Sequence, residues 1–341
     1  MSSEISEITA VGIGTAGTKI VSLLREHSLL VDKFLYVSCD RSDLEGIPDD
    51  ERVLIESRVD QKLSPALVRG LSLGSLAKIR EEISGSKVVF VVAGLGGATG
   101  SGLAPVVASI SRECGATTIG VAVMPFEFEK KMRFYAGVSL RRLRGATRGV
   151  IVVDNDTLMS SSPEDSTLTN LYDASNREAV KALGSLLAKS STDSISVGLN
   201  KVLGTVVQEG YSLLGVSSSG APDKAEEALA GAVLSLGKLA ETKEASHVVV
   251  VLNGDQSLSA QDVGLVVKHL GSLMSNESVD VEYGVNYSGA NQLQVSLLAS
   301  GFRATKYDSY DPIATILGDR IMDDEMDASL PEGLELLQSC D

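Results

Sequence analysis

A run of β-branched apolar residues opens directly into a glycine-rich loop at residues 88–105, and few folds accommodate such a junction. The run Val88–Ala93 is typical of a buried parallel strand. Five glycines and two hydroxyl residues, Thr99 and Ser101, follow it, and the apolar segment Leu103–Ile110 can begin a helix. A strand, a glycine loop and a helix in this order turn backbone N–H groups towards an anion. The stretch therefore predicts a site for the phosphates of a nucleotide.

A second glycine loop follows the short apolar segment Ile8–Val11. Residues Gly12–Gly17 have the Gly-x-Gly-x-x-Gly spacing of dinucleotide-binding proteins. Asp40 follows a further strand at a distance that suits a ribose contact. Taken alone, this loop supports a nicotinamide-dependent oxidoreductase. Two such loops at the carboxyl ends of parallel strands instead favour one nucleotide whose phosphates are held from both sides.

Composition limits the classes of partner and compartment. The chain has 341 residues, 43% of them hydrophobic, and a net charge of −15. This acidity argues against nucleic acid or an anionic membrane as a partner. The three cysteines are scattered, which argues against a disulfide framework. The histidines are isolated, which argues against a metal site. The sequence has no long apolar run, which argues against direct membrane insertion. We expect a cytoplasmic protein.

Strand and helix patterns alternate over the first half of the chain. Predicted strands lie at 8–12, 33–38, 87–93, 117–123 and 149–153, with helices between them. Such alternation predicts an α/β fold with a mainly parallel sheet. A long helix is expected at 172–190 and another at 201–215, followed by a turn-rich segment at 217–222. A second, smaller α/β domain follows, in which strands 278–287 and 291–298 are predicted to pair antiparallel.

The residues of both loops carry a family resemblance. Gly96–Gly102 resembles the glycine-rich signature of the tubulin/FtsZ superfamily, with alanine in place of its third glycine. Ala104–Ala108 and Pro125–Glu129 are similar to FtsZ almost letter for letter. Gly14–Ile20 is closer to tubulin and the archaeal CetZ group. The resemblance covers roughly residues 8–305 and implies an archaeal-type FtsZ/CetZ-like protein.

The same resemblance implies a division of the chain. Residues 1–171 would be the GTP-binding domain, and 172–200 the central helix with the catalytic (synergy) loop. Residues 201–318 would be the C-terminal domain, and 319–341 an acidic, flexible tail.

The resemblance also implies which residues bind a guanine nucleotide. The phosphates would lie among the residues of the two loops and the loop after the second strand, namely Gly14, Thr15, Ala16, Gly17, Thr18, Asp40, Gly96, Gly97, Ala98, Thr99 and Gly100. Phosphate sites of this kind usually use Mg²⁺, which is therefore a candidate cofactor beside GTP or GDP.

Five further positions would contact the ribose and base. Glu129 and Arg133 match FtsZ positions at the ribose and base, and Asn155 matches an asparagine that reads guanine. Tyr172 and Asn176 reproduce the tubulin spacing of a stacking aromatic and an amide on one helix face. FtsZ usually has an aspartate after this asparagine, where this chain has Arg177, so discrimination of guanine from adenine is weakened.

The largest departure from the family lies in the synergy loop, which in a filament completes the neighbouring subunit's active site. Its motif, Asn-x-Asp-x-x-Asp, places water against the γ-phosphate. Carried over position by position, the three motif residues become Ser196, Gly198 and Lys201. Serine, glycine and a lysine ammonium cannot act as general bases at neutral pH. The catalytic set is therefore predicted to be degenerate, with no intact member.

The resemblance and this departure lead to one main hypothesis and three alternatives. The chain is expected to be a GTP-binding cytoskeletal protein of cell division or cell shape, with weak or absent self-activated hydrolysis. Its partners would be further copies, head to tail, or an active FtsZ/CetZ paralogue. The alternatives are an active polymerisation-dependent GTPase in which Asp193 substitutes for the lost acids, the NAD-dependent oxidoreductase, and a nucleotide-free structural subunit.

Overall fold

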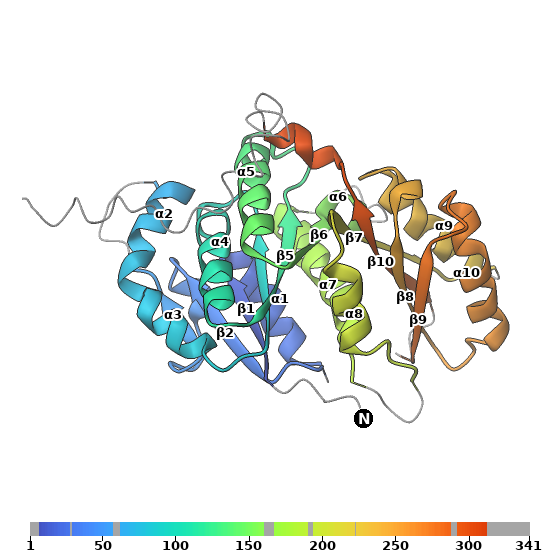
Figure 1. The fold of residues 1–341 in the computed structure, drawn as a ribbon, viewed down its shortest axis with the longest axis horizontal. Coiled ribbons are helices and arrows are strands. Elements are labelled where there is room, and N and C mark those ends of the chain that lie inside the picture. The colour runs from blue at the N-terminus through green and yellow to red at the C-terminus, as the bar shows by residue number, and fades with distance from the viewer. Residues whose placement is uncertain are drawn as a thin grey trace, which may run out of the picture.

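Among the residues that the structure describes, ten strands form one mixed sheet with helices on both faces (Figure 1). The computed structural model describes residues 7–27, 29–56, 62–159, 167–189, 194–221, 223–287 and 292–311. The strand order is β3-β2-β1-β4-β5-β6-β7-β10-β8-β9. The predicted α/β fold class is confirmed.

The first seven strands run parallel to their neighbours. Strand β10 is antiparallel to both β7 and β8, and β9 is parallel to β8. The strands are β1 (Ile8–Ile13), β2 (Lys33–Ser38), β3 (Arg52–Leu54), β4 (Val88–Gly94), β5 (Thr117–Met124), β6 (Gly149–Asp154), β7 (Tyr211–Ser219), β8 (His247–Gly254), β9 (Asp280–Tyr287) and β10 (Leu293–Phe302).

Helices bury apolar side chains against each face of the sheet. Helices α2 to α5, α9 and α10 pack on one face, whereas α1, α7 and α8 pack on the other. The helices are α1 (Gly14–Arg25), α2 (Pro65–Ser72), α3 (Leu76–Ile83), α4 (Ala98–Glu113), α5 (Lys130–Ala146), α6 (Asn155–Leu158), α7 (Leu168–Leu186), α8 (Leu199–Val206), α9 (Lys224–Gly237) and α10 (Ala260–Leu273). Short 3₁₀ segments are η1 (Ser42–Leu44), η2 (Leu73–Ser75), η3 (Thr242–Glu244) and η4 (Lys306–Tyr310).

The predicted glycine loop after β4 is shorter than its composition suggests. Helix α4 begins at Ala98, so only residues 95–97 bridge strand and helix. Gly100 already lies in the first turn of α4, where a Cβ would approach the Gly94 carbonyl oxygen to 2.2 Å. This glycine therefore allows the helix to pack against the end of its own strand, as expected where a helix must approach a strand closely.

Two predictions for the C-terminal half are wrong. The segment predicted to be a helix at 201–215 contains α8, which ends at Val206, and then the start of β7. This strand continues to Ser219, into the segment predicted to be a turn at 217–222. Strands β9 and β10 do not pair with each other, because β10 lies between β7 and β8. The burial explains the arrangement: nearly every residue of β10 is buried, whereas β9 is an edge strand with exposed residues.

The seam between the halves of the sheet is narrow. Strands β6 and β7 pair only at Ile151–Ser212 and Val152–Leu213. Beyond this seam, β10 runs back along nearly the whole length of β7. The acidic tail predicted at 319–341 lies outside the described residues. No helix in the described part of the chain is long and apolar enough to span a bilayer.

Candidate nucleotide-binding site

The residues predicted for nucleotide binding gather at one edge of the sheet. They follow the carboxyl ends of β1, β2, β4, β5 and β6, which are parallel, or lie on α7. The strand order β3-β2-β1-β4-β5-β6 also matches the order of dinucleotide-binding folds, in which ligands bind outside these strand ends. Topology alone is therefore compatible with either a guanine nucleotide or a dinucleotide.

Two helix N-termini meet at this edge. Helices α1 and α4 both begin without a side-chain cap, and neither has an acidic residue in its first turn. Their first N–H groups thus remain available to an anion. A Cβ built on Gly14, which has φ +66°, would lie 3.2 Å from Cβ of Thr99 and 3.3 Å from N of Gly100. The two predicted phosphate loops are therefore in contact.

Close packing explains most glycines in these loops, but not Gly97. A Cβ on Gly17 would approach the Val92 carbonyl oxygen to 2.2 Å, so α1 can rest against β4 only with glycine there. A Cβ on Gly94 would meet Cβ of Ala16 at 2.9 Å. Gly97, the N-cap of α4, is exposed and has no atom within 4 Å of such a Cβ. Open space at this position suits the close approach of a ligand.

Two loop hydroxyls shape the backbone. The buried Thr18 hydroxyl donates to the carbonyl oxygen of Gly14 at 2.9 Å. Ser101, also buried, accepts the Gly96 N–H at 2.9 Å and so fixes the bend after β4. This side chain therefore holds the loop as an acceptor, and its O–H can still act as a donor.

The loop after β2 brings carboxylates close to α1. Asp40 is exposed and accepts hydrogen bonds from both the backbone N–H and the hydroxyl of Ser42, and these bonds lower its pKa. Asp43, which the sequence did not single out, accepts from the hydroxyls of Ser38 at 2.6 Å and Thr15 at 3.2 Å. Asp43 thus ties this loop to the first turn of α1.

The described residues at this edge do not form a complete set of protein ligands for Mg²⁺. No group of three His, Cys, Asp or Glu side chains suited to a metal occurs among the described residues. Oδ1 of Asp40 and Oδ2 of Asp43 already accept hydrogen bonds from protein donors. This arrangement fits a cation held chiefly by phosphates and water, which is how Mg²⁺ is commonly bound beside a nucleotide.

Glu129 and Tyr172 come together at the far end of the same edge. The Tyr172 hydroxyl donates to Oε1 of Glu129, and the Phe126 N–H donates to Oε2 at 2.8 Å. The Tyr172 ring also meets the Phe126 ring edge-on, with centroids 5.4 Å apart. Burial, together with the neighbouring Glu129 carboxylate, raises the pKa of Tyr172, so its hydroxyl stays protonated at neutral pH.

The two predicted amides are buried beside this pair. Oδ1 of Asn155, at the start of α6, accepts from the Ser175 hydroxyl of α7 at 2.7 Å. Asn176 is the next residue on α7, and both asparagines are at most 7% exposed. The structure thus joins α6 and α7 at the positions predicted to read the base.

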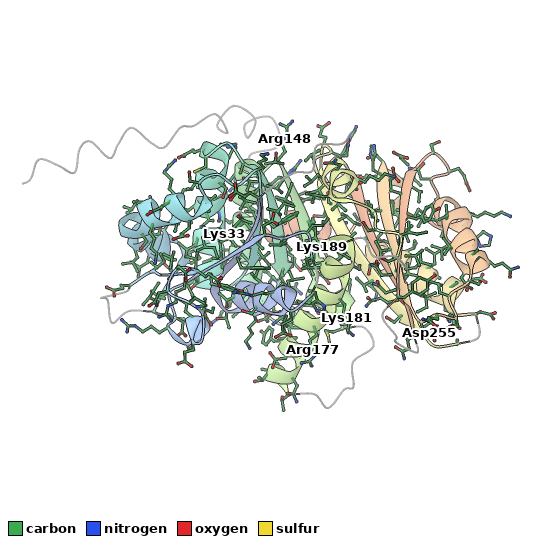
Figure 2. All side chains as sticks on the ribbon, turned by 90° about the horizontal axis from the view of Figure 1, so that it is seen from below. Lys33, Arg148, Arg177, Lys181, Lys189 and Asp255 are labelled. Atoms are coloured by element: carbon green, nitrogen blue, oxygen red, sulfur yellow. The ribbon has the colours of Figure 1, made fainter. Side chains whose placement is uncertain are left out.

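Arg133 has partners other than Glu129 and Tyr172, and Arg177 is exposed. The Arg133 guanidinium donates to the Glu127 carbonyl oxygen at 2.5 Å and lies over the Tyr310 ring, 5.1 Å from its centroid. Arg177 is exposed on α7, where it precedes Lys181, and Lys189 lies beyond the end of that helix (Figure 2). Among the described residues, no hydrogen bond or ion pair joins Arg133 to Glu129 or Tyr172, and its place at the base stays a prediction.

The positions that the resemblance assigns to the catalytic loop lie at the opposite edge of the sheet. Helix α7 runs away from the candidate site, and Ala188, just beyond it, bridges to Leu29 ahead of β2. Gly198 has φ +83° and forms the N-cap of α8, while Lys201 forms an ion pair with Glu282 of β9. Asp193, the alternative acid, lies outside the described residues.

A cavity of about 1030 Å³ lies between α7 and the C-terminal strands. Its lining includes Lys181, Gly184, Asn253 and Gln294. None of the residues predicted to bind a nucleotide lines it. The strand-end edge, with its two uncapped helix N-termini, remains the better anion site on chemical grounds.

The position of Cys39 beside Thr99 allows a direct test of the phosphate end of the site. Burial raises the pKa of the Cys39 thiol, which a hydrogen bond to the Thr99 side chain partly offsets. With GTP at about ten times its Kd, alkylation of Cys39 is expected to slow about tenfold, because only the free protein reacts. Iodoacetamide labelling followed by mass spectrometry measures this rate. Cys114, at the far end of α4, is the internal control and should react at an unchanged rate.

Comparison with known proteins agrees with this arrangement. Residues 7–163 match the model of the Tubulin/FtsZ family, GTPase domain. The structure is similar to the FtsZ dimer of M. jannaschii, with 25% identity, a TM-score of 0.76 and coverage of 89% of each chain. It is also similar to GDP-bound CetZ1 from Haloferax volcanii, with 23% identity, a TM-score of 0.73 and coverage of 92% of this chain and 100% of that one. The GTPγS-bound protofilament of CetZ2 from the same organism matches with 23% identity, a TM-score of 0.70 and coverage of 93% and 99%. Over residues 7–163, this chain is thus similar to the GTPase domain of the Tubulin/FtsZ family.

Proposed function

We propose that this chain binds GTP or GDP at the strand-end site and assembles head to tail, with weak or absent self-activated hydrolysis. The observation that carries the proposal is the contrast between two edges. One edge has two touching, uncapped helix N-termini. The other presents Ser196, Gly198 and Lys201 where the family resemblance calls for an asparagine and two aspartates. The family match favours a guanine nucleotide over a nicotinamide cofactor.

In the proposed site, different residues bind the phosphates and the base of the nucleotide. Backbone N–H groups at Gly14–Thr18 and Gly97–Gly100 hold the phosphates, and the positive ends of both helix dipoles add to the attraction. Mg²⁺ would supply further charge neutralisation on the phosphates. Tyr172, held by Glu129, faces the base together with Asn155 and Asn176. The binding is thus mostly backbone positioning of charge, which is also the main contribution that proteins make to phosphoryl transfer.

Assembly would place the α8 edge of one copy against the nucleotide of the next. Lys201 then brings a cation, which attracts phosphate but cannot take a proton from water. The FtsZ dimer and the CetZ2 protofilament support head-to-tail assembly as the mode. An FtsZ/CetZ paralogue that supplies acidic residues is the alternative neighbour. Either way, we place the role in a cytoskeletal filament of cell division or cell shape.

One observation favours a second candidate, an active polymerisation-dependent GTPase. Glu282 of β9 contacts Lys201, so a carboxylate stands beside the degenerate position although the loop itself has none. The backbone of Ile195 also pairs with Val285 of the same strand, which fixes β9 against the loop. Glu282 could in this way replace the lost acids.

One experiment separates these functions. The purified protein is denatured, its bound nucleotide is identified by chromatography, and phosphate release from GTP is followed against protein concentration. The proposal expects bound GTP or GDP and slow release that does not steepen with assembly. A steep rise with concentration would establish the active GTPase instead, and NAD without guanine nucleotide would establish the oxidoreductase. Addition of an active paralogue tests co-assembly through the gain in phosphate release.

A further inference from the structure

The last described segment of the chain returns to the N-terminal half of the fold. After β10, residues Thr305–Asp311, here called the C-terminal strap, include η4 and lie against α5 (Figure 1). The approach is close, because a Cβ on Gly137 of α5 would come within 2.5 Å of the Tyr310 carbonyl carbon. Tyr307 of the strap is only 2% exposed. The strap is therefore an integral part of the packing around the candidate site.

The strap supplies the partners of a buried carboxylate. Asp154 is 1% exposed, and its Oδ2 accepts from the Tyr307 hydroxyl at 2.6 Å and pairs with Nζ of Lys306 at 2.7 Å. A buried carboxylate is costly without such partners. Both partners come from residues about 150 positions away in the chain, so the sheet end and the strap stabilise each other.

The other oxygen of Asp154 acts on the candidate site. Asp154 is the N-cap of α6, and its Oδ1 accepts the Thr157 N–H at 2.9 Å. The first residue of that helix is Asn155, which is bonded to Ser175 of α7. A carboxylate at this end also interacts favourably with the helix dipole. The orientation of α6, and with it the Asn155 amide, thus depends on a group that the strap holds.

A second set of strap contacts strengthens the connection. The Tyr310 ring lies beneath the guanidinium of Arg133, and Oδ2 of Asp311 pairs with Nε of Arg141 at 2.7 Å. Both arginines lie on α5, which begins directly after Glu129. The strap therefore contacts the elements that carry Glu129 and Asn155, but neither residue directly.

We propose that Asp154, Lys306 and Tyr307 are positioning residues that set the affinity of the site for the base of the nucleotide. This inference rests on the proposed function, because it takes Asn155 to contact that base. The Tyr307 hydroxyl and the Lys306 ammonium hold Asp154, Asp154 holds the start of α6, and α6 presents the Asn155 amide. Thermodynamic linkage makes the effect reciprocal: binding of the base stabilises the strap by the same free energy.

The test uses the full chain with Tyr307→Phe, which removes one hydroxyl and leaves the buried ring. Loss of a hydrogen bond to a charged group is expected to raise the Kd for GTP about tenfold. The affinity for inorganic tripolyphosphate, measured by competition, should not change, because it engages only the phosphate end. Tyr310→Phe is the matched control, since the described structure gives its hydroxyl no hydrogen bond, and it should leave both affinities unchanged. Asp154→Asn should weaken GTP similarly, and the double variant with Tyr307→Phe should add little further loss.

Hydrogen exchange supplies a second readout. Addition of GTP to the wild type should slow exchange at residues 305–311, whereas tripolyphosphate should not. If Tyr307→Phe lowers the melting temperature but leaves the ratio of GTP to tripolyphosphate affinity unchanged, the strap is only structural and the inference is wrong, while the proposed function stands. If the wild type binds tripolyphosphate but no guanine nucleotide, the proposed function itself is wrong and this inference falls with it.

Discussion

Replacement of Gly97 by aspartate is expected to abolish GTP retention without loss of the fold. Gly97 is exposed, and a Cβ there meets open space, so the side chain causes no clash. Aspartate is also a better N-cap than glycine, which favours α4. Two unit charges 4 Å apart repel by about 4 kcal/mol at an effective dielectric constant of about 20. We therefore expect the Kd for GTP to rise by at least about 100-fold.

Isothermal titration with GTP measures this loss, and thermal unfolding of the nucleotide-free protein reports the fold. Gly264→Asp is the matched control: Gly264 is an exposed glycine of α10 with the same open space and the same change in charge. It should bind GTP like the wild type. Normal GTP affinity in Gly97→Asp would show that the phosphates do not lie at the N-terminus of α4.

Replacement of Lys201 by aspartate is expected to raise GTP turnover of the assembled protein about 100-fold. The change restores a carboxylate at a position that the family resemblance assigns to the catalytic loop, and general bases typically contribute about 10²–10⁴-fold. Phosphate release, measured above and below the concentration at which sedimentation detects assembly, gives the turnover. The gain should appear only in the assembled protein, because the loop acts on the nucleotide of its neighbour.

Two further variants interpret that result. Lys243→Asp changes the same charge at an exposed position on η3 and should leave turnover at the wild-type level. Glu282→Gln combined with Lys201→Asp removes the repulsion between two neighbouring carboxylates and should preserve the gain. If the wild type is already fast and Glu282→Gln alone slows it, Glu282 is the working acid and the weak-hydrolysis proposal is wrong.

The first half of the fold could be predicted because its signals are local. The strands at 33–38 and 117–123 are short runs rich in aromatic, aliphatic or β-branched residues, and the structure places them at Lys33–Ser38 and Thr117–Met124. The second half failed where neighbours in sequence are not neighbours in space. A short connection suggested that β9 and β10 pair, but α10 returns the chain so that β9 runs parallel to β8, and the more apolar β10 takes the central place. Tyr211–Ser219 was missed as a strand because its glycine and serines weaken the β signal.

The candidate site shows the same division. The glycines that follow β1 and β4 were found because close packing and an anion site both demand glycine at those places. Asp43, Asp154 and Tyr307 were not found, since each acts through a partner that only the tertiary structure supplies. The role of Arg133 at the base stays a prediction, because its guanidinium has partners that compete with a ligand, namely Glu127 and the Tyr310 ring. Spacing along a helix could not reveal that competition.

The narrow seam between β6 and β7 has a mechanical consequence. Only two pairs of residues join β6 to β7 there, whereas β7 and β10 pair over most of their length. A twist of one half against the other strains few backbone hydrogen bonds along this line, so we expect the two halves to rotate most easily here. The hydrogen bond between Tyr307 and Asp154 also joins the two halves across this line. Its loss is therefore expected to make rotation of one half against the other easier.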